Sequence, residues 1–396
     1  MQFTLDFHEG LGGTDGAIVV DMKNFKNFSI DPVTQVATIG AGTPLWQVTQ
    51  ELHDAGGRAM AHGTCPSIGI GGHATIGGQG PTSRMWGMSL DHVLKVEVVL
   101  ANSTTIRAST TENPDVLFAI KGAGASFGIV TEFTVRTEPE PGSAVQYSYT
   151  FNRGDQGSNA KLFEEWQSLI SDPTLSRNFA GVFTVSNDII VVSGTYFGTK
   201  TEFDAFQLEH RFPNSTSSSA IEFTDWLGLV AHWGEDVFLQ AITNVPAWFY
   251  SKSLSFSPQT LIPASGIENL FQYLTNQAPG TPAWFVIFNL VGGAINDIPT
   301  NATAYPHRNS LYWMQSYAVT AGAVSETTIN FLDGINNVIA ASLPGIDFGA
   351  YAGYVDPRLP NGQQEYWGSN LPMLQQIKAT VDPTDVFHNP QSVRPT

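Results

Sequence analysis

The residues best suited to chemistry lie in one glycine-rich tract, Gly63–Gly80, which holds the only cysteine of the chain, Cys65, and a histidine, His73. Glycine lacks a Cβ atom, so a backbone rich in it can approach a flat or charged ligand and turn several amide N–H groups toward it. Isoleucines alternate with the glycines and favour an ordered, half-buried loop. The spacing alone leaves a ligand-binding loop and a merely flexible loop both open.

Two common phosphate-binding loops are excluded for this tract. It has no Gly-Lys-Ser/Thr, and it has no Gly-x-Gly-x-x-Gly that opens a helix. A single thiol cannot form an intramolecular disulfide, and the residues around Cys65 match no zinc site, so we expect no metal. Cys65 is then either a small buried hydrophobic residue or a reactive group, and the residues alone favour the first interpretation.

Length and composition indicate a folded protein of two lobes. The 396 residues exceed one ordinary domain, 42% are hydrophobic and only 13% are charged. A formal charge of −17 repels phosphate backbones and anionic lipid surfaces. No apolar stretch approaches the roughly 20 residues of a membrane span. We therefore expect neither nucleic acid nor a membrane as partner.

The first part of the chain reads as mixed helix and strand. We expect strands over residues 17–20, 34–39, 93–100 and 128–135 and helices over residues 44–55 and 114–121. Thr43 is the expected N-cap of the first helix, with Pro44 at its first position.

The pattern changes after Ser143. Short strand-like runs are typical of an antiparallel sheet and cover residues 145–151, 180–184, 189–194, 253–257, 284–291 and 311–319. Amphipathic helices are expected at about residues 160–170, 224–233, 266–275, 325–340 and 371–380. The predicted fold class is α+β, with lobes over residues 1–140 and 141–345 and a segment over residues 346–396 that returns to the first lobe.

Four separated motifs resemble the berberine-bridge-enzyme-like FAD oxidases, with the fungal glucooligosaccharide and chitooligosaccharide oxidases most similar. They are Gly63-Thr64-Cys65 through Gly87, Leu117 through Thr131, Tyr305-Pro306-His307-Arg308-Asn309 with Leu311-Tyr312-x-x-Gln315, and Tyr366-Trp367-Gly368-x-Asn370 through Ser392. The resemblance runs from Gly10 to Pro395 and implies a PCMH-type FAD-binding lobe, truncated at its N-terminus, and a substrate lobe with an antiparallel sheet flanked by helices.

The resemblance also implies cofactor-binding residues. Cys65 would bond C6 of the flavin ring, which fits the addition of a thiolate to an electron-poor ring and would raise its reduction potential. The other residues expected to contact FAD are Gly63, Thr64, Gly69, Gly71, Gly72, His73, Gly77, Gly78, Ile129, Val130, Tyr366 and Asn370. His73 keeps a purely structural role as an alternative.

The same resemblance implies the residues that act on the substrate. Tyr351 and Tyr354 match the paired tyrosines beside the flavin, with Tyr354 as the base for the hydroxyl proton. Gln315 would hydrogen-bond the substrate. Asn289 stands where sugar oxidases carry an acidic residue, and an amide can orient a phenol but cannot take its proton. Trp284, Tyr312 and Trp313 are candidates to stack on sugar rings or to fill the sheet core.

One part of the family pattern differs. Relatives carry an Arg-x-Gly-Gly-His-Ser loop before a Gly-Leu-Gly-Gly stretch like Gly10–Gly13, and its histidine bonds the flavin 8α-methyl group. Here Met1–Leu5 occupies those places, Thr4 stands near the histidine position, and His8 is too late to replace it. We expect a truncated or alternative start, weaker cofactor retention, and FAD linked through Cys65 alone.

Three functions remain open. The first is oxidation of a carbohydrate or related alcohol, such as an oligosaccharide, with electron transfer to O2. The second keeps the fold but takes a secondary metabolite, and Asn289 favours it. The third is a flavin-free remnant, which the missing N-terminal loop supports.

Signals for localisation disagree. Asn27, Asn102, Asn214 and Asn301 each begin an Asn-x-Ser/Thr sequon, which is typical of a secreted glycoprotein. Residues 1–10 lack the basic segment and apolar core of a signal peptide. We expect secretion for the full-length family form.

Overall fold

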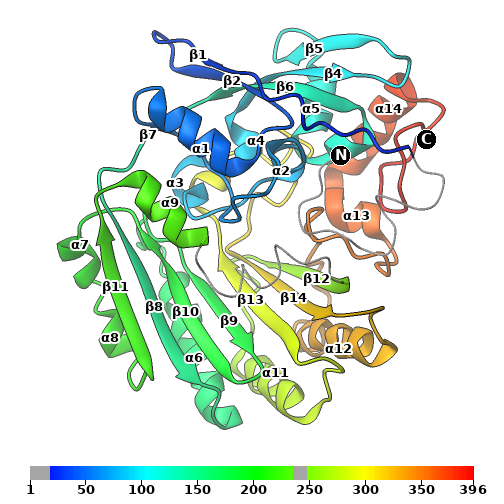
Figure 1. Cartoon of the computed structure of the whole chain (residues 1–396). Helices are drawn as coiled ribbons and strands as arrows, with labels where there is room; N and C mark the ends of the chain where they lie inside the picture. Colours follow the sequence, from blue (N-terminus) through cyan, green and yellow to red (C-terminus); the bar gives the residue numbers. More distant parts are fainter. Residues whose placement is uncertain (1–17, 235–247) are drawn as a thin grey trace.

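The computed structural model describes residues 18–234 and 248–396 and shows two lobes (Figure 1). Each lobe is built on its own antiparallel sheet, which confirms the α+β prediction. Within the described ranges, no helix is long and apolar enough to cross a membrane.

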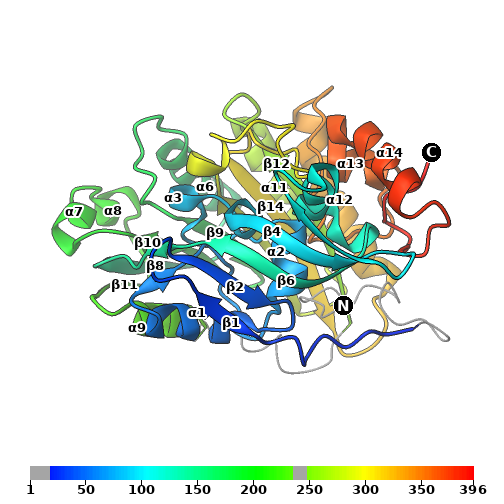
Figure 2. The same ribbon diagram turned by 90° about the horizontal axis from the view of Figure 1, so that it is seen from above.

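The first lobe contains a five-stranded sheet of order β1-β2-β6-β4-β5, of which β1, β2, β6 and β4 lie side by side in Figure 2. These strands are β1 (Phe28–Ile30), β2 (Val36–Gly40), β4 (Val93–Val99), β5 (Thr105–Ser109) and β6 (Ile129–Arg136), with a separate pair β3 (Arg58–Ala59) and β7 (Glu138–Pro139). The helices are α1 (Leu45–Asp54), α2 (Ile70–Ile76), α3 (Ser83–Trp86), α4 (Ser89–His92) and α5 (Pro114–Ala123), with a 3-10 turn η1 (Gly124–Ser126).

The second lobe contains a seven-stranded sheet of order β11-β8-β10-β9-β13-β14-β12, so β12 is an edge strand. Its strands are β8 (Ala144–Asn152), β9 (Val182–Ser186), β10 (Ile189–Tyr196), β11 (Ser217–Phe223), β12 (Trp248–Phe256), β13 (Ala283–Leu290) and β14 (Tyr312–Thr320). Its helices are α6 (Gln156–Ile170), α7 (Lys200–Asp204), α8 (Leu208–Arg211), α9 (Trp226–Gly234), α11 (Ala264–Asn276) and α12 (Glu326–Ser342), with a 3-10 turn η2 (Gly293–Ile295).

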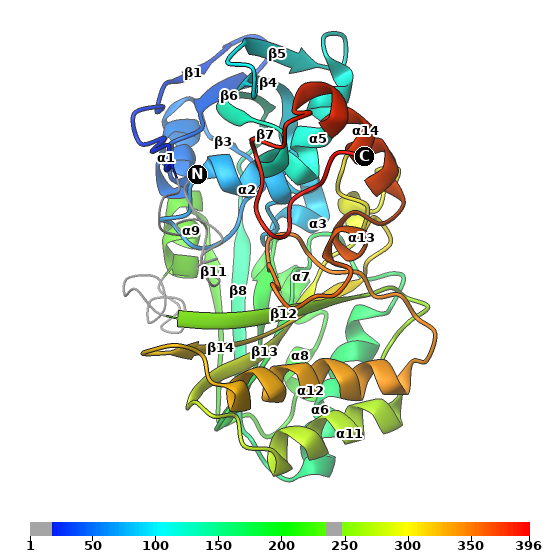
Figure 3. The same cartoon turned by 90° about the vertical axis from the view of Figure 1, so that its right-hand side faces the viewer.

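The two faces of the seven-stranded sheet have different partners. Helices α6, α11 and α12 lie on the side away from the first lobe (Figures 1 and 3). They pack there on alternate strand residues, including Phe183, Trp284 and Tyr312. Because side chains alternate along a strand, the intervening residues form the opposite face, which is turned toward the first lobe. We call this opposite face the site face.

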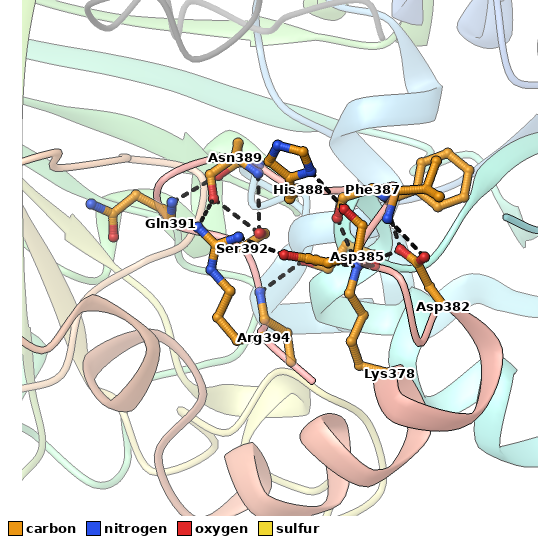
Figure 4. Close-up of polar contacts among 12 residues, drawn as sticks. Lys378, Asp382, Asp385, Phe387, His388, Asn389, Gln391, Ser392 and Arg394 are labelled. Carbon is orange, nitrogen blue, oxygen red and sulfur yellow. Dashed lines mark hydrogen bonds and ion pairs between the residues drawn. The ribbon is translucent and has the colours of Figure 1, made fainter. Parts of the chain in front are cut away.

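The C-terminal segment packs on the first lobe. It contains α13 (Gly362–Trp367), η3 (Gly368–Asn370) and α14 (Leu371–Val381), and Leu374, Ile377 and Val393 join the first hydrophobic core. Lys378, fully buried, donates to the carbonyl of Ser126 at 2.7 Å and pairs with Asp382 at 2.6 Å (Figure 4). This buried cation fixes the tail to the lobe.

A buried ion pair joins the lobes at a second place. Arg308, in the loop before β14, forms a bidentate pair with Asp91 of α4 at 2.8 and 2.9 Å, and both side chains are at most 2% exposed. The Arg308 guanidinium also lies 5.0 Å from the centre of the Tyr305 ring. The loop is thereby held against the first lobe.

Most predicted elements are confirmed within one to five residues at each end, and three expectations are wrong. Residues 18–20 form no strand, and the glycine tract is not a continuous loop because residues 70–76 form α2. Thr43 does not cap the first helix, whose N-cap is Pro44, and its hydroxyl is buried without a hydrogen bond in the described part of the chain.

Candidate active site

The site face carries no Asp, Glu, Lys, Arg or His on its seven strands as the structure describes them. On the central and edge strands its residues are Val182, Thr184 and Ser186 of β9, Phe285, Ile287 and Asn289 of β13, Trp313, Gln315 and Tyr317 of β14, and Ser251, Ser253 and Ser255 of β12. The charged strand residues Lys252 and Glu222 lie in register with the helix-covered face. The surface toward the first lobe is thus uncharged, hydroxyl-rich and aromatic.

The structure brings Gln315 and Asn289 together on this face. Gln315 is half-buried between Ile287 and Ser253 of the neighbouring strands. Asn289 is half-buried opposite Trp313, two residues from Ile287 along β13, which makes the two amides diagonal neighbours. Both can offer hydrogen bonds to one ligand above the sheet.

The glycine tract folds back on the end of β2. Gly71 donates its N–H to the carbonyl of Ala41 at 3.1 Å, and a Cβ at this position would lie 2.6 Å from that oxygen. Gly69 pairs with Pro44 in an isolated bridge and precedes α2, whose first turn contains Gly72. The amide of Gly71 is therefore committed inside the protein, not turned toward a ligand as the resemblance implies.

His73 holds the start of the tract in place. Its Nε2 accepts the N–H of Gly63 at 2.9 Å. Burial, together with the nearby His62, lowers the pKa of His73 to about 3, so the ring is a neutral acceptor. The structure thus gives His73 a structural role beside Thr64 and Cys65, in line with the alternative that the sequence left open.

Tyr351 closes the far end of the tract. Its hydroxyl accepts the N–H of Gly78 at 3.1 Å. A Cβ on Gly77 would lie 2.4 Å from that hydroxyl oxygen, so only glycine admits the phenol there. Its ring lies 5.0 Å from that of Tyr354 and 5.7 Å from that of Trp313. The paired tyrosines therefore stand between the glycine tract and the site face.

Cys65 and Tyr354 both lie near enough to Tyr317 to affect its pKa. Cys65 is buried, with 4% of its surface exposed, and Tyr354 is half-buried. Burial raises the pKa of Tyr317 well above its usual 10, and the nearby Cys65 and Tyr354 raise it further. The sulfur and the candidate base therefore approach the same side chain of the site face.

A buried polar side chain at the end of the tract lacks a partner. Neither amide atom of Gln79 makes a hydrogen bond in the described ranges, although both are buried. Its amide lies near Tyr305. Burial raises the pKa of Tyr305 to about 12, and Gln79 acts in the opposite direction. A buried amide donor and acceptor beside Tyr305 could serve a flat polar ring, so the residues present fit FAD.

Four predicted cofactor residues have contacts within the protein. Ile129 and Val130 pair with Val99 and Val98 in the first sheet, where they pack on the core of that lobe. The Tyr366 hydroxyl accepts the N–H of Asp356 at 2.9 Å.

The fourth of these residues, Asn370, donates to the carbonyls of Thr300 and Thr303 at 2.8 and 3.0 Å. The polar ends of Tyr366 and Asn370 thus fix loops of the protein. The expected departures at residues 1–13, including Thr4, His8 and Gly10–Gly13, lie outside the described residues.

Two of the three aromatic candidates for stacking are corrected. Trp284 and Tyr312 lie in the core on the helix-covered face and cannot reach a ligand over the site face. Trp313 lies on the site face and donates its Nε1–H to the Tyr305 hydroxyl at 3.3 Å. Phe285, 3.7 Å from Tyr317 between ring centres, is an aromatic residue of the site face that the sequence analysis missed.

Ser253 and Tyr317 were missed as well. Ser253 accepts the N–H of Tyr351 at 3.0 Å. Both residues share a face with Gln315, and strand alternation through Gln315 would have indicated them. Gln79 had no such signal, because a glutamine beside glycines is common in loops.

Comparisons with known proteins agree with this geometry. The family described as FAD binding domain matches residues 6–109, and the family described as berberine and berberine like matches residues 350–394. FAD-linked oxidoreductase sorD of Penicillium rubens is 41% identical over 97% of this chain and 82% of its own. The structure of xylooligosaccharide oxidase from Myceliophthora thermophila in complex with xylobiose shares 30% identity, with a TM-score of 0.88 over 98% of this chain and 84% of the other.

A third comparison concerns the flavin linkage. Glucooligosaccharide oxidase from Acremonium strictum, studied for the roles of its 6-S-cysteinyl, 8α-N1-histidyl FAD, matches with 29% identity and a TM-score of 0.85. The match covers 95% of this chain and 82% of that one. By the motifs, the fold and the extent of these matches, the chain belongs to the berberine-bridge-enzyme-like family of FAD-dependent oxidoreductases acting on CH–OH groups.

Proposed function

We propose that this protein oxidises a hydroxyl group of a neutral carbohydrate, such as an oligosaccharide, or of a similar alcohol and passes the electrons to O2. The uncharged, hydroxyl-rich site face beside the paired tyrosines Tyr351 and Tyr354 carries the proposal. A charged substrate would find no counter-ion on these strands, whereas sugar hydroxyls can bond to serine, threonine and amide side chains. Carbohydrate oxidases among the relatives support the same substrate class.

The residues divide the chemical work. When bound, FAD supplies the hydride acceptor, and O2 then takes both electrons to give hydrogen peroxide. Tyr354 takes the hydroxyl proton as the carbonyl forms. Tyr317, whose raised pKa keeps it a neutral phenol, can donate a hydrogen bond to the substrate. Gln315 and Asn289 orient the substrate hydroxyls from the sheet.

Cys65 is the proposed covalent anchor of FAD. Its side chain is buried in the glycine tract near Tyr317 of the site face, and a relative carries a 6-S-cysteinyl flavin. Addition to the ring would convert the thiol into an uncharged thioether. The buried position would therefore not have to hold a charged thiolate permanently.

Acid precipitation tests the anchor. Flavin colour should stay in the pellet of the native protein and move to the supernatant for Cys65→Ala. Peroxide release with xylobiose or cellobiose tests the reaction in the same preparation. A colourless native protein would favour the flavin-free remnant, and colour that stays in the Cys65→Ala pellet would exclude the thioether.

A secondary metabolite is the second candidate substrate. Asn289 lacks the acidic group that assists a tyrosine base, and the relative of 41% identity is the oxidoreductase sorD, not one of the sugar oxidases. Oxidation of neutral phenolic alcohols with no response to oligosaccharides would favour it.

We also propose that the protein is secreted and glycosylated. Asn27, Asn102, Asn214 and Asn301, which begin the four sequons, are all exposed. A drop in mass on treatment with an N-glycosidase after fungal expression would support this, and an unchanged mass would contradict it.

A further inference from the structure

The segment that carries Tyr354 holds edge strand β12 from both faces. On the site face, Ser253 accepts the N–H of Tyr351 at 3.0 Å. On the helix-covered face, the neighbouring Lys252 pairs with Asp356 at 2.6 Å. Because consecutive strand residues point to opposite faces, the segment from Tyr351 to Asp356 must wrap around the open edge of the strand.

Asp356 uses all of its polar groups within the protein and is only 3% exposed. Its carboxylate accepts from the Tyr250 hydroxyl at 2.8 Å, from Lys252 at 2.6 Å and from the N–H of Arg358 at 2.9 Å. Its own N–H donates to Tyr366, and its carbonyl accepts from Gln391, both at 2.9 Å. Asp356 is therefore a fixed point two residues after Tyr354.

Lys252 extends this contact to the helix layer. Its ammonium group also lies 3.0 Å from a carboxylate oxygen of Asp333 in α12, and its side chain is 11% exposed. The cation thus joins the tyrosine segment, the edge strand and the helix behind the sheet. Removal of one carboxylate leaves Lys252 paired with the other.

From these contacts we infer that Asp356, held by Lys252, is a positioning residue for the proposed base Tyr354. It lies on the opposite side of the strand from the substrate surface and acts only through the segment it anchors. A misplacement of about 1 Å in a reacting group costs roughly a hundredfold in rate. This inference rests on the proposed function, in which Tyr354 takes the proton.

The variant Asp356→Asn tests the inference, with Asp382→Asn as its matched control. Asp382 is likewise a buried aspartate paired with a buried lysine, but its contacts lie in the C-terminal tail. With the flavin-loaded protein and xylobiose as probe, we expect kcat to fall roughly ten- to a hundredfold in Asp356→Asn, with KM changed less than about threefold. Asp382→Asn should lower the melting temperature and leave kcat per bound flavin unchanged.

Hydrogen exchange provides a readout that needs neither substrate nor turnover. Amides of residues 348–358 should exchange faster in Asp356→Asn than in the native protein or in Asp382→Asn. Lys252→Met should reproduce the effect, and the double variant should be no worse than the more severe single one, since both remove the same contact.

The outcomes separate the inference from the proposed function. Native exchange and native kcat in Asp356→Asn would overturn the inference. Retained activity in Tyr354→Phe would instead reject Tyr354 as the base, while faster exchange in Asp356→Asn would still establish the anchor. Equal loss of kcat in Asp356→Asn and Asp382→Asn would show general destabilisation and also overturn it.

Discussion

At the scale of single residues, the site combines neutral polar groups with one sulfur. Asn289 is the residue whose chemistry limits the proposed reaction most directly, because its amide cannot share the proton that Tyr354 must take. A carboxylate in the same place could do so.

Asn289→Asp should therefore raise the rate of xylobiose oxidation near neutral pH by roughly tenfold. The measurement is peroxide release per bound flavin across a pH series. Asn289→Leu, which removes the hydrogen bond at similar size, should lower the rate and serves as the control. Unchanged or lower activity in the aspartate variant would count against a sugar substrate.

Gly78 is needed for the contact between the glycine tract and Tyr351. Its φ of +82° is strained for any L side chain, and a Cβ would lie 2.4 Å from atoms of Ser89. Gly78→Ala should lower the free energy of unfolding by about 2 kcal/mol or more. Gly322→Ala, where a Cβ meets nothing within 4 Å, should change it by less than about 0.5 kcal/mol. Urea unfolding of the two variants checks the difference, and similar values would contradict it.

At the scale of elements, the pair Arg308–Asp91 joins α4 to the loop before β14. Asp91→Asn leaves a buried guanidinium without its partner and should lower the free energy of unfolding by about 3–5 kcal/mol. The control is the pair Arg177–Asp297, in which each side chain is more than half exposed. Asp297→Asn should lower the free energy of unfolding by at most about 1 kcal/mol. Thermal unfolding measures both, and a small effect at Asp91 would mean that the lobes are held by other contacts.

The elements themselves were largely predictable from the sequence. Long runs such as β14 and α12 combine a clear period with defined ends, so hydrophobic spacing alone located them. By contrast, β11 has the polar sequence Ser217-Ser218-Ser219 and forms because β8 offers an edge, which no local pattern records. Helix α2 contains consecutive glycines that disfavour a helix, and its hydrogen bonds to Ala41 and Thr43 outweigh that preference.

The site was predictable only where a motif named the residue. The rings of Tyr351 and Tyr354 contact each other, and the resemblance named both residues, whereas the residues alone favoured Cys65 as a small buried hydrophobic residue. The partners Ser253 and Lys252 depend on the register of an edge strand against a segment about one hundred residues later. Such long-range contacts leave no trace in local sequence.

At the scale of the whole molecule, buried neutral histidines should make stability fall in acid. Burial lowers the pKa of His73 and His92 to about 3 and that of His307 to about 4, below the ordinary 6.5. The unfolded chain therefore binds more protons than the native one below about pH 6.5, and stability is lost as pH falls from there toward the folded pKa values.

We expect the melting temperature to fall steadily between pH 6.5 and 4.5, a range above the titration of most carboxylates. The glutamine in His73→Gln can still accept the Gly63 N–H. This variant should reduce the slope of the free energy of unfolding against pH by up to about 1.4 kcal/mol per pH unit. A flat profile in the native protein, or an unchanged slope in the variant, would contradict this account.

The wrapped edge of β12 has a consequence for how copies of the protein behave toward one another. An exposed strand edge is a template for pairing with another chain, and β12 ends its sheet. Here the N–H of Ser255 donates to the carbonyl of Phe348. Farther along the strand, Ser253 bonds to Tyr351 and Lys252 pairs with Asp356. The segment that carries the proposed base thus also covers the strand edge, so a substitution that loosens it should affect both turnover and self-association.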